Sequence, residues 1–318
     1  MAARLVYTQS EASSESKLKQ LRSKDHTLVD HWHGKKRVRV LKVQRGDDEN
    51  PTHMISEFTV QTRLFSPMYQ KVFTLEDNSE LVATDTQKNT VYVVAKRSRA
   101  TTPEDFALDM ARHLIDQYKM LSAVEVEVRQ KSWERARVHG IPHEHAFTRG
   151  SEEVSGAVAR IERGNKPEVT SQILGLTVLK TTQSGFTNYL HDKFTLLPET
   201  TERCLATEMD ASWSYSPTPN TAQVDYAAVR NAVRSELLRG IFGPARGGVY
   251  SESLQASVYD AGCLVLTACP QVTKININTP NLHYLPYKQL EQMGEVFEDD
   301  VFVPTSEPSG TIHCTVGR

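Results

Sequence analysis

The chain has 318 residues, of which 39% are hydrophobic and 24% are charged. This is enough for two domains or one large one around a packed core. A formal net charge of −2 gives no electrostatic reason to expect a nucleic acid or an anionic membrane as partner. The sequence has no apolar run of about 18 residues and no apolar segment near its start, so we expect neither a transmembrane helix nor a secretory signal.

The first 30 residues are polar and rich in serine and charge, which predicts a mobile arm. Ordered structure is predicted to begin near Lys35, because valines alternate with basic residues over 37–43 as in a half-exposed strand. Residues 58–64 alternate similarly. Further on, Thr84 followed three residues later by Gln87 is typical of a capping box at a helix start.

A stronger helix signal begins at Thr102, a good N-cap residue before Pro103. Residues 124–129 then alternate between apolar and charged side chains, which predicts a strand directly after the helix. The apolar residues of the helix recur every four positions and predict a buried stripe: Phe106, Met110, Leu114 and Tyr118.

The same order of elements recurs later in the chain. Asp225 is the predicted cap of a helix that ends at Gly243-Pro244, and Ser253 is the predicted cap of a helix over 254–269. Residues 273–279 then alternate as a strand. The first of these helices carries one apolar face: Tyr226, Val229, Val233, Leu237 and Ile241.

Both halves therefore predict an α+β fold of antiparallel strands with helices on one face of the sheet. The division is expected in the glycine- and charge-rich stretch around 149–167, giving an arm over 1–30, a first half over 31–155 and a second half over 156–318. Sequence identity between the halves is negligible, so the repeat is one of architecture. A polar sheet face suggests a barrel lumen or a hydrated interface.

The first candidate site is the predicted helix start at Thr84 and Asp85. Unpaired backbone N–H groups at such a start can bind an anion or a polarised oxygen, and a hydroxyl and a carboxylate lie beside them. Thr84 could also do no more than cap the helix. Lys35, which follows Gly34, is by itself typical of a surface lysine.

The second half offers candidates for binding a planar ligand. Arg203 could form an ion pair or clamp a planar anion, and Phe186 could stack on a ring or belong to the core. Gln255 would lie at the second position of its helix, next to the unpaired amide of Leu254, and the two together can read the edge of a heterocycle.

Two further sets of polar residues are candidates for a site. Asn281 and His283 end the last long strand and would face the same way. A histidine cluster is an obvious metal candidate, but no carboxylate or cysteine completes it, which favours a structural or interface role. Its members are His139, His143 and His145. The cysteines have no zinc or disulfide spacing, and we expect buried, reduced thiols: Cys204, Cys263, Cys269 and Cys314.

Several separate motifs, in the right order, resemble the urate oxidase family. They are residues 77–79 with 82–92, residues 175–186, residues 280–283 and residues 314–318. The resemblance runs from about Gly34 to the end of the chain. Residues 242–251 most resemble the plant and algal branch.

The resemblance implies the tunnelling fold, with two similar halves in each subunit. In this family the antiparallel sheets form a barrel across subunits with the helices outside, and two barrels stack into a homotetramer around a central tunnel. The family uses neither a metal nor an organic cofactor, so the histidine cluster would be structural.

The resemblance also implies the roles of the candidate residues, with an active site between subunits. Lys35 and Thr84 resemble the family's catalytic Lys–Thr dyad, and His283 of the neighbouring subunit would complete a proton relay. Asn281, with Thr84, resembles the pocket that holds dioxygen or water above the substrate ring.

The remaining residues resemble the substrate-binding set. Arg203 and Gln255 would grip opposite edges of the purine, and Phe186 would lie under the ring. The backbone amides of Leu254 and Asp85 would be further donors. Many relatives carry valine where this chain has Leu254, which matters little if only its backbone takes part.

The implied reaction is urate + O2 + H2O to 5-hydroxyisourate + H2O2. The alternatives are another tunnelling-fold enzyme of purines or pterins, such as a zinc cyclohydrolase, or a purine-binding relative without catalysis. Eukaryotic relatives are peroxisomal, but this sequence ends in Val316-Gly317-Arg318, which is not a Ser-Lys-Leu-type signal, so a cytosolic location stays open.

Overall fold

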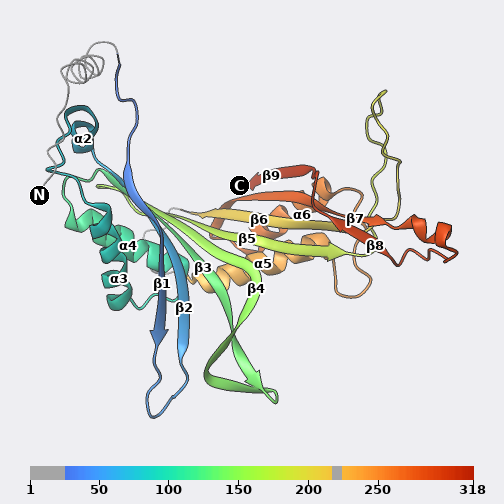
Figure 1. Cartoon of the computed structure of the whole chain (residues 1–318), viewed down its shortest axis with the longest axis horizontal. Coiled ribbons are helices and arrows are strands. Elements are labelled where there is room, and N and C mark those ends of the chain that lie inside the picture. Colours follow the sequence, from blue (N-terminus) through green and yellow to red (C-terminus); the bar gives the residue numbers. More distant parts are fainter. Residues whose placement is uncertain (1–25, 217–223) are drawn as a thin grey trace, which may run out of the picture.

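The computed structural model describes residues 26–216 and 224–318. Within them, nine antiparallel strands form a long twisted sheet in the order β1–β2–β3–β4–β5–β6–β7–β8, with β9 paired to β7 (Figure 1). The strands are β1 (His33–Gln44), β2 (Met54–Phe65), β3 (Ala123–Val138), β4 (Ile141–Glu162), β5 (Glu168–Lys180), β6 (Leu205–Tyr215), β7 (Val272–Pro286), β8 (Phe302–Thr305) and β9 (Thr311–Gly317).

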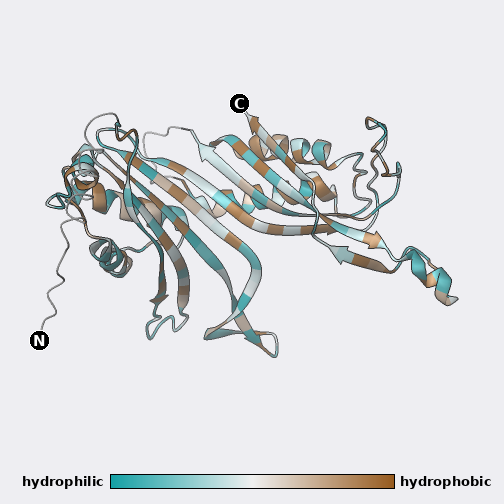
Figure 2. Cartoon of the chain, turned by 45° about the horizontal axis from the view of Figure 1, so that its top comes forward, coloured by the Kyte–Doolittle hydropathy of each residue, from teal (hydrophilic) through white to brown (hydrophobic). Residues whose placement is uncertain are grey.

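Two pairs of long helices pack on this sheet. The first pair contacts the strands of the first half, and the second pair contacts β5, β7 and β9. Figure 2 shows hydrophilic and hydrophobic residues alternating along the strands, as a sheet with one covered face requires. The helices are η1 (Pro67–Tyr69), α2 (Gln70–Leu75), α3 (Thr84–Arg97), α4 (Pro103–Gln117), α5 (Tyr226–Phe242), α6 (Leu254–Ala268) and η3 (Lys288–Met293).

The sheet and helices enclose two hydrophobic cores, one on each half of the sheet. In the first core, the rings of Phe58 and Phe106 stack with centroids 4.9 Å apart. In the second, Trp213 and Leu237 are completely buried. The predicted apolar faces of α4 and α5 are confirmed, except that Tyr118 follows the last turn of α4 and is only half-buried.

Three predicted helix starts are confirmed by their capping bonds. The Thr102 side chain accepts a hydrogen bond from the Asp105 amide at 3.2 Å. Asp225 caps α5 and Ser253 caps α6 in the same way, each by accepting from the amide three residues on. These caps satisfy N–H groups that a helix start otherwise leaves unpaired, which is why the sequence pattern located them.

The predicted capping box at Thr84 is wrong. Helix α3 begins at Thr84, its N-cap residue is Ala83, and no side chain caps it. Gln87 points into the core instead: its Nε2 donates to the carbonyl of Val82 at 3.1 Å, and its Oε1 accepts from the Thr62 hydroxyl at 2.7 Å. These buried partners keep Gln87 away from the helix start, and the Thr84 hydroxyl has no hydrogen bond to any described residue.

The stretch expected to divide the halves is not a separate linker. Residues 149–162 belong to β4, which is 22 residues long and pairs with β3 and β5. The sheet therefore runs through the predicted boundary between residues 155 and 156, and the division into halves at that point stays a prediction. Residues 1–25 of the predicted arm lie outside the described residues.

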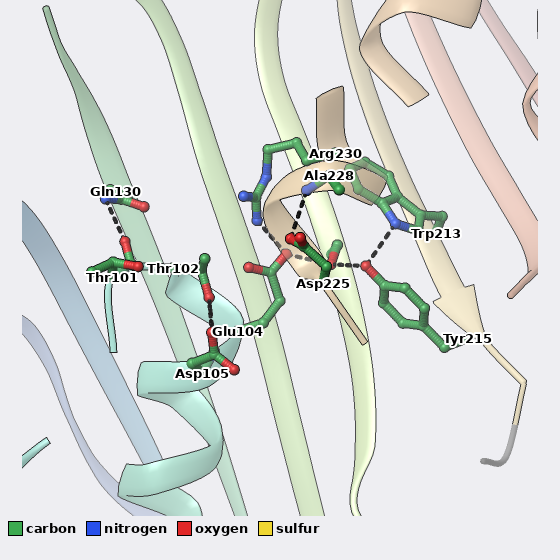
Figure 3. A network of polar contacts seen from close by, with 11 residues as sticks. Thr101, Thr102, Glu104, Asp105, Gln130, Trp213, Tyr215, Asp225, Ala228 and Arg230 are labelled. Carbon is green, nitrogen blue, oxygen red and sulfur yellow. Dashed lines mark hydrogen bonds and ion pairs between the residues drawn. The ribbon is translucent and has the colours of Figure 1, made fainter. Parts of the chain in front are cut away.

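A buried polar network joins the two cores (Figure 3). The carboxylate of Glu104 on α4 pairs with the guanidinium of Arg230 on α5 and accepts a hydrogen bond from the hydroxyl of Ser171 on β5. The Ser171 hydroxyl lies 2.6 Å from that of Tyr215, which accepts from the indole N–H of Trp213 at 3.0 Å. Burial raises the pKa of Tyr215, so it remains a neutral hydrogen-bonding phenol.

The thiols correct one smaller expectation. All four cysteines are free, but only Cys269 is buried, so the expectation of buried thiols is wrong for the half-buried Cys204, Cys263 and Cys314. No helix among the described residues is long and apolar enough to span a membrane.

Candidate functional site

A cavity of about 190 Å³ lies where β6 and β7 approach the start of α6. It is lined by apolar residues such as Leu205 and Leu285, together with a few polar groups. Five of the predicted site residues line it: Phe186, Arg203, Leu254, Asn281 and His283. The fold thus brings together residues that are as much as 97 positions apart (Phe186 to His283).

Arg203 is the most unusual group in this cavity. Its guanidinium lies over the ring of Phe186, with the central carbon 5.3 Å from the ring centroid. Its Nε is buried without a hydrogen-bond partner, and the side chain forms no ion pair with any residue of 26–216 or 224–318. Burial lowers the pKa of Arg203. A partly desolvated guanidinium without a counter-charge is suited to bind an anion.

The start of α6 forms another wall of the cavity. Ser253 accepts from the Ala256 amide, so Leu254 and Gln255 occupy the first two helical positions, as predicted, and the Leu254 amide has no partner within the helix. The Leu254 side chain is buried, whereas Gln255 is exposed and does not line the cavity. The structure therefore does not place the Gln255 side chain among the groups that line this cavity.

Asn281 and His283 are two residues apart on β7, and both reach the cavity, as predicted. Asn281 lies opposite Thr207 of β6, and its backbone N–H donates to the carbonyl of Gly310 at 2.8 Å. His283 lies opposite Thr305 of β8. Pairing on both sides fixes this end of β7, so the two side chains are held by the sheet.

A second group of predicted residues lies at β1 and the start of α3. Lys35 is followed by an irregularity in the β1–β2 register, where Arg37 has a φ of +61°. A Cβ on Gly34 would lie 2.0 Å from the carbonyl oxygen of Thr62, so only glycine allows this close approach of the strands. The chain before Lys35 is therefore tightly fixed on β2.

The carboxylate of Asp85 lies on the surface of α3, where it accepts hydrogen bonds from Lys88 and Asn89. The hydrogen bond from Lys88 lowers the pKa of Asp85, and the nearby charge of Lys35 contributes in the same direction. Asn89 also donates to this carboxylate, at 2.8 Å. The Asp85 amide is left unpaired in the first turn, where it resembles the predicted backbone donor.

Two residues that sequence reasoning did not assign to the site connect Lys35 to α3. The amide of Lys35 donates to the Thr62 hydroxyl at 3.2 Å, and that hydroxyl donates to Gln87 at 2.7 Å. Gln87 in turn holds the carbonyl of Val82, two residues before Thr84. The signal in the sequence that could have pointed to this connection is Thr62, a polar residue on the buried face of an alternating strand.

The two groups of site residues do not meet within one chain. Lys35 and Thr84 belong to β1 and α3, whereas the cavity lies beside β7, and these labels lie toward opposite ends of the molecule in Figure 1. Each chain therefore carries one group of predicted site residues beside β7 and the other group at β1 and the start of α3.

The histidine cluster lies on the β3–β4 hairpin, away from both groups. The rings of His143 and His145 have centroids 4.5 Å apart, and His53 lies 5.8 Å from His145. His139 is in the turn with a φ of +51°. Over the described part of the chain, no group of three or more His, Cys, Asp or Glu side chains is arranged to hold a metal ion.

Comparisons with known proteins agree with the resemblance seen in the motifs. A sequence model of the Uricase family matches residues 31–159 and 169–313. Uricase-2 isozyme 2 of Glycine max is 41% identical over 90% of this chain and 94% of its own length. The uricase of Arabidopsis thaliana is 40% identical over 92% and 97%, and that of Oryctolagus cuniculus is 34% identical over 93% and 96%.

A solved structure extends the similarity to three dimensions. The crystal structure of uricase from Arthrobacter globiformis superimposes with a TM-score of 0.83 at 34% identity, covering 93% of this chain and 96% of that one. The higher identity to the two plant proteins than to the rabbit protein agrees with the plant-like motif at 242–251. This chain is a member of the uricase family.

Proposed function

We propose that this protein is a cofactor-independent urate oxidase that converts urate, O2 and H2O to 5-hydroxyisourate and H2O2. The observation that carries the proposal is Arg203, a half-buried guanidinium that has no ion-pair partner among the described residues and lies over an aromatic ring in a small cavity. Membership of the uricase family fixes the class of chemistry to consider.

Urate matches this cavity because it is planar and anionic. Arg203 would present its fork of donors to one edge of the purine, and Phe186 would support the ring face with few rotamers to freeze. The carboxamide of Gln255 offers one donor and one acceptor, which complement a lactam edge. The unpaired amides of Leu254 and Asp85 would bind further purine atoms.

The active site would be completed by a second copy of this chain. No lysine is among the residues that line the cavity beside β7, and the group at α3 lacks an aromatic platform for the ring, so the two groups are complementary. Sheets that close into a barrel across subunits would bring them together and would cover the polar sheet face. We propose a homotetramer of two stacked barrels with helices outside, as in the tunnelling fold.

Within such a site, Lys35, Thr84 and His283 would move protons. Urate gives up two electrons to O2, which takes two protons to form H2O2, and water then adds to the oxidised ring. The Thr84 hydroxyl suits a proton relay because it forms no hydrogen bond with any described residue. Asn281 would hold O2 or the attacking water above the ring. The dry cavity would stabilise the reactive urate anion through Arg203.

The test uses purified protein treated with a chelator. We expect loss of urate absorbance with one H2O2 formed per urate consumed. Stoichiometric zinc together with no urate consumption would overturn the proposal in favour of a cyclohydrolase-like enzyme. Binding of urate without turnover would instead indicate a purine-binding relative.

A peroxisomal location would suit an enzyme that releases H2O2, and we propose it for this protein with the cytosol as the alternative. Fluorescent fusions at each end of the chain would test it. A diffuse signal from both fusions would refute the peroxisomal location.

A further inference from the structure

Lys180, the last residue of β5, has a buried side chain, although no carboxylate of the described residues lies within ion-pair distance of it and the charge of Glu202 acts on it only from further away. Its exposed fraction is 9%. Its ammonium donates to the Ser251 hydroxyl at 3.1 Å, to the carbonyl of Val249, and to the carbonyl of Ile241 at 3.5 Å. All three ammonium protons thus have acceptors, from the end of α5 and from the segment that leads to α6.

Ser251 connects this ammonium to the aromatic wall of the cavity. Its carbonyl accepts from the Gly185 amide at 2.9 Å, and its amide donates to the Gln183 carbonyl at 2.8 Å. Gly185 directly precedes Phe186, and a Cβ there would lie 2.1 Å from the Tyr250 hydroxyl. The position of Ser251 therefore fixes the backbone directly before Phe186, whose own N–H and carbonyl pair with Thr200.

The same serine also connects to α6. The Ser257 hydroxyl, one turn into the helix, donates to the Ser251 hydroxyl at 3.0 Å. Ser257 also contacts the carbonyl of Ser253 at 3.3 Å, directly before Leu254. Both serine side chains are buried. The start of α6 and the Phe186 segment are thus tied to one point, and Lys180 holds that point.

We infer that Lys180, acting through Ser251, is a positioning residue that sets the spacing between Phe186 and the start of α6. The inference rests on the proposed function, in which the purine is held between these two walls. A buried ammonium is costly to keep without a carboxylate, and an apolar side chain would cost less to bury. What offsets this cost is that the ammonium fixes the end of α5, the Phe186 segment and the start of α6 relative to one another.

The test compares Lys180→Met and Ser251→Ala with the unchanged protein, by urate turnover and by binding of xanthine, a purine that lacks the 8-oxo group. We expect Lys180→Met to raise KM for urate and Kd for xanthine by roughly 10-fold or more while kcat falls by less than about 3-fold. Ser251→Ala should act in the same direction by roughly 3-fold, because the backbone bonds of Ser251 remain.

Lys42→Met is the matched control. Lys42 also donates to a backbone carbonyl, that of Ser98 after α3, but it lies in the first half of the chain. Lys42→Met should leave KM for urate unchanged within about 2-fold. If Lys180→Met does not fold, Ser251→Ala decides, because it removes a single oxygen atom.

KM and Kd within twofold of the unchanged protein in both variants would overturn the inference. A fall of kcat and thermal stability in proportion, without a rise in KM, would also overturn it by showing a purely structural role. If the unchanged protein oxidises urate but neither variant shows a rise in KM or Kd, the inference about Lys180 fails and the proposed function stands. If the unchanged protein neither oxidises urate nor binds xanthine, both proposals fail.

Discussion

Arg230→Met should show how strongly the two cores depend on the polar network between them. The carboxylate of Glu104 is completely buried, and the Arg230 side chain is 10% exposed. Removing the guanidinium leaves a buried carboxylate whose one remaining hydrogen-bond donor among the described residues is the Ser171 hydroxyl. Breaking one side of such a pair costs about 3–5 kcal/mol, because the remaining charge is desolvated.

The corresponding change in melting temperature follows from the length of the chain. At about 2.1 cal/mol/K per residue, 318 residues give an unfolding entropy of about 0.7 kcal/mol/K, so the loss equals about 4–7 °C in Tm. Replacing both partners, in Glu104→Leu with Arg230→Met, should recover most of this loss. Ser171 and Tyr215 would still bond to each other in that double variant.

The assay is calorimetry at one fixed protein concentration, because assembly makes Tm depend on concentration. The control is Arg239→Met, on the same helix, whose pair with Glu236 is exposed on the arginine side. An exposed pair contributes about 0–1 kcal/mol, so its Tm should fall by less than about 1.5 °C. The reasoning is refuted if Arg230→Met falls no further than this control, or if the double variant melts below the single one.

Three further predictions concern the group at β1 and α3. Lys35→Met or Thr84→Ala should lower kcat by about 100-fold or more while xanthine still binds, and full turnover in either variant would contradict the relay. Thr62→Val should cost about 1–3 kcal/mol in urea unfolding, because the buried Gln87 loses its donor, and adding Gln87→Leu should restore most of it. Burial lowers the pKa of His33 in the folded protein, so the unfolded chain binds more protons and stability should fall as pH decreases below about 6.5. His33→Gln should weaken this loss of Tm between pH 7.5 and 5.5, and an unchanged pH profile would contradict it.

The sequence by itself determined the elements whose signals are local. Thr102, Asp225 and Ser253 marked helix starts because a cap and the amide that it satisfies lie three residues apart. Alternation over 124–129 marked β3 because the strand period is written in adjacent residues. The urate oxidase motifs identified the family for a similar reason, since each is a short continuous stretch.

Only the tertiary structure decided which side chains meet. Thr84–Gln87 fits a capping box, but Gln87 bonds to Thr62, which is 25 residues away, and that contact leaves no trace in the local pattern. The charged stretch at 149–162 became part of β4 because strands on both sides pair with it. Arg203 could have been a surface ion pair, but its half-buried position over Phe186, without a carboxylate partner among the described residues, made it a candidate anion site. These outcomes depend on contacts between distant segments, whose energies no local window of sequence contains.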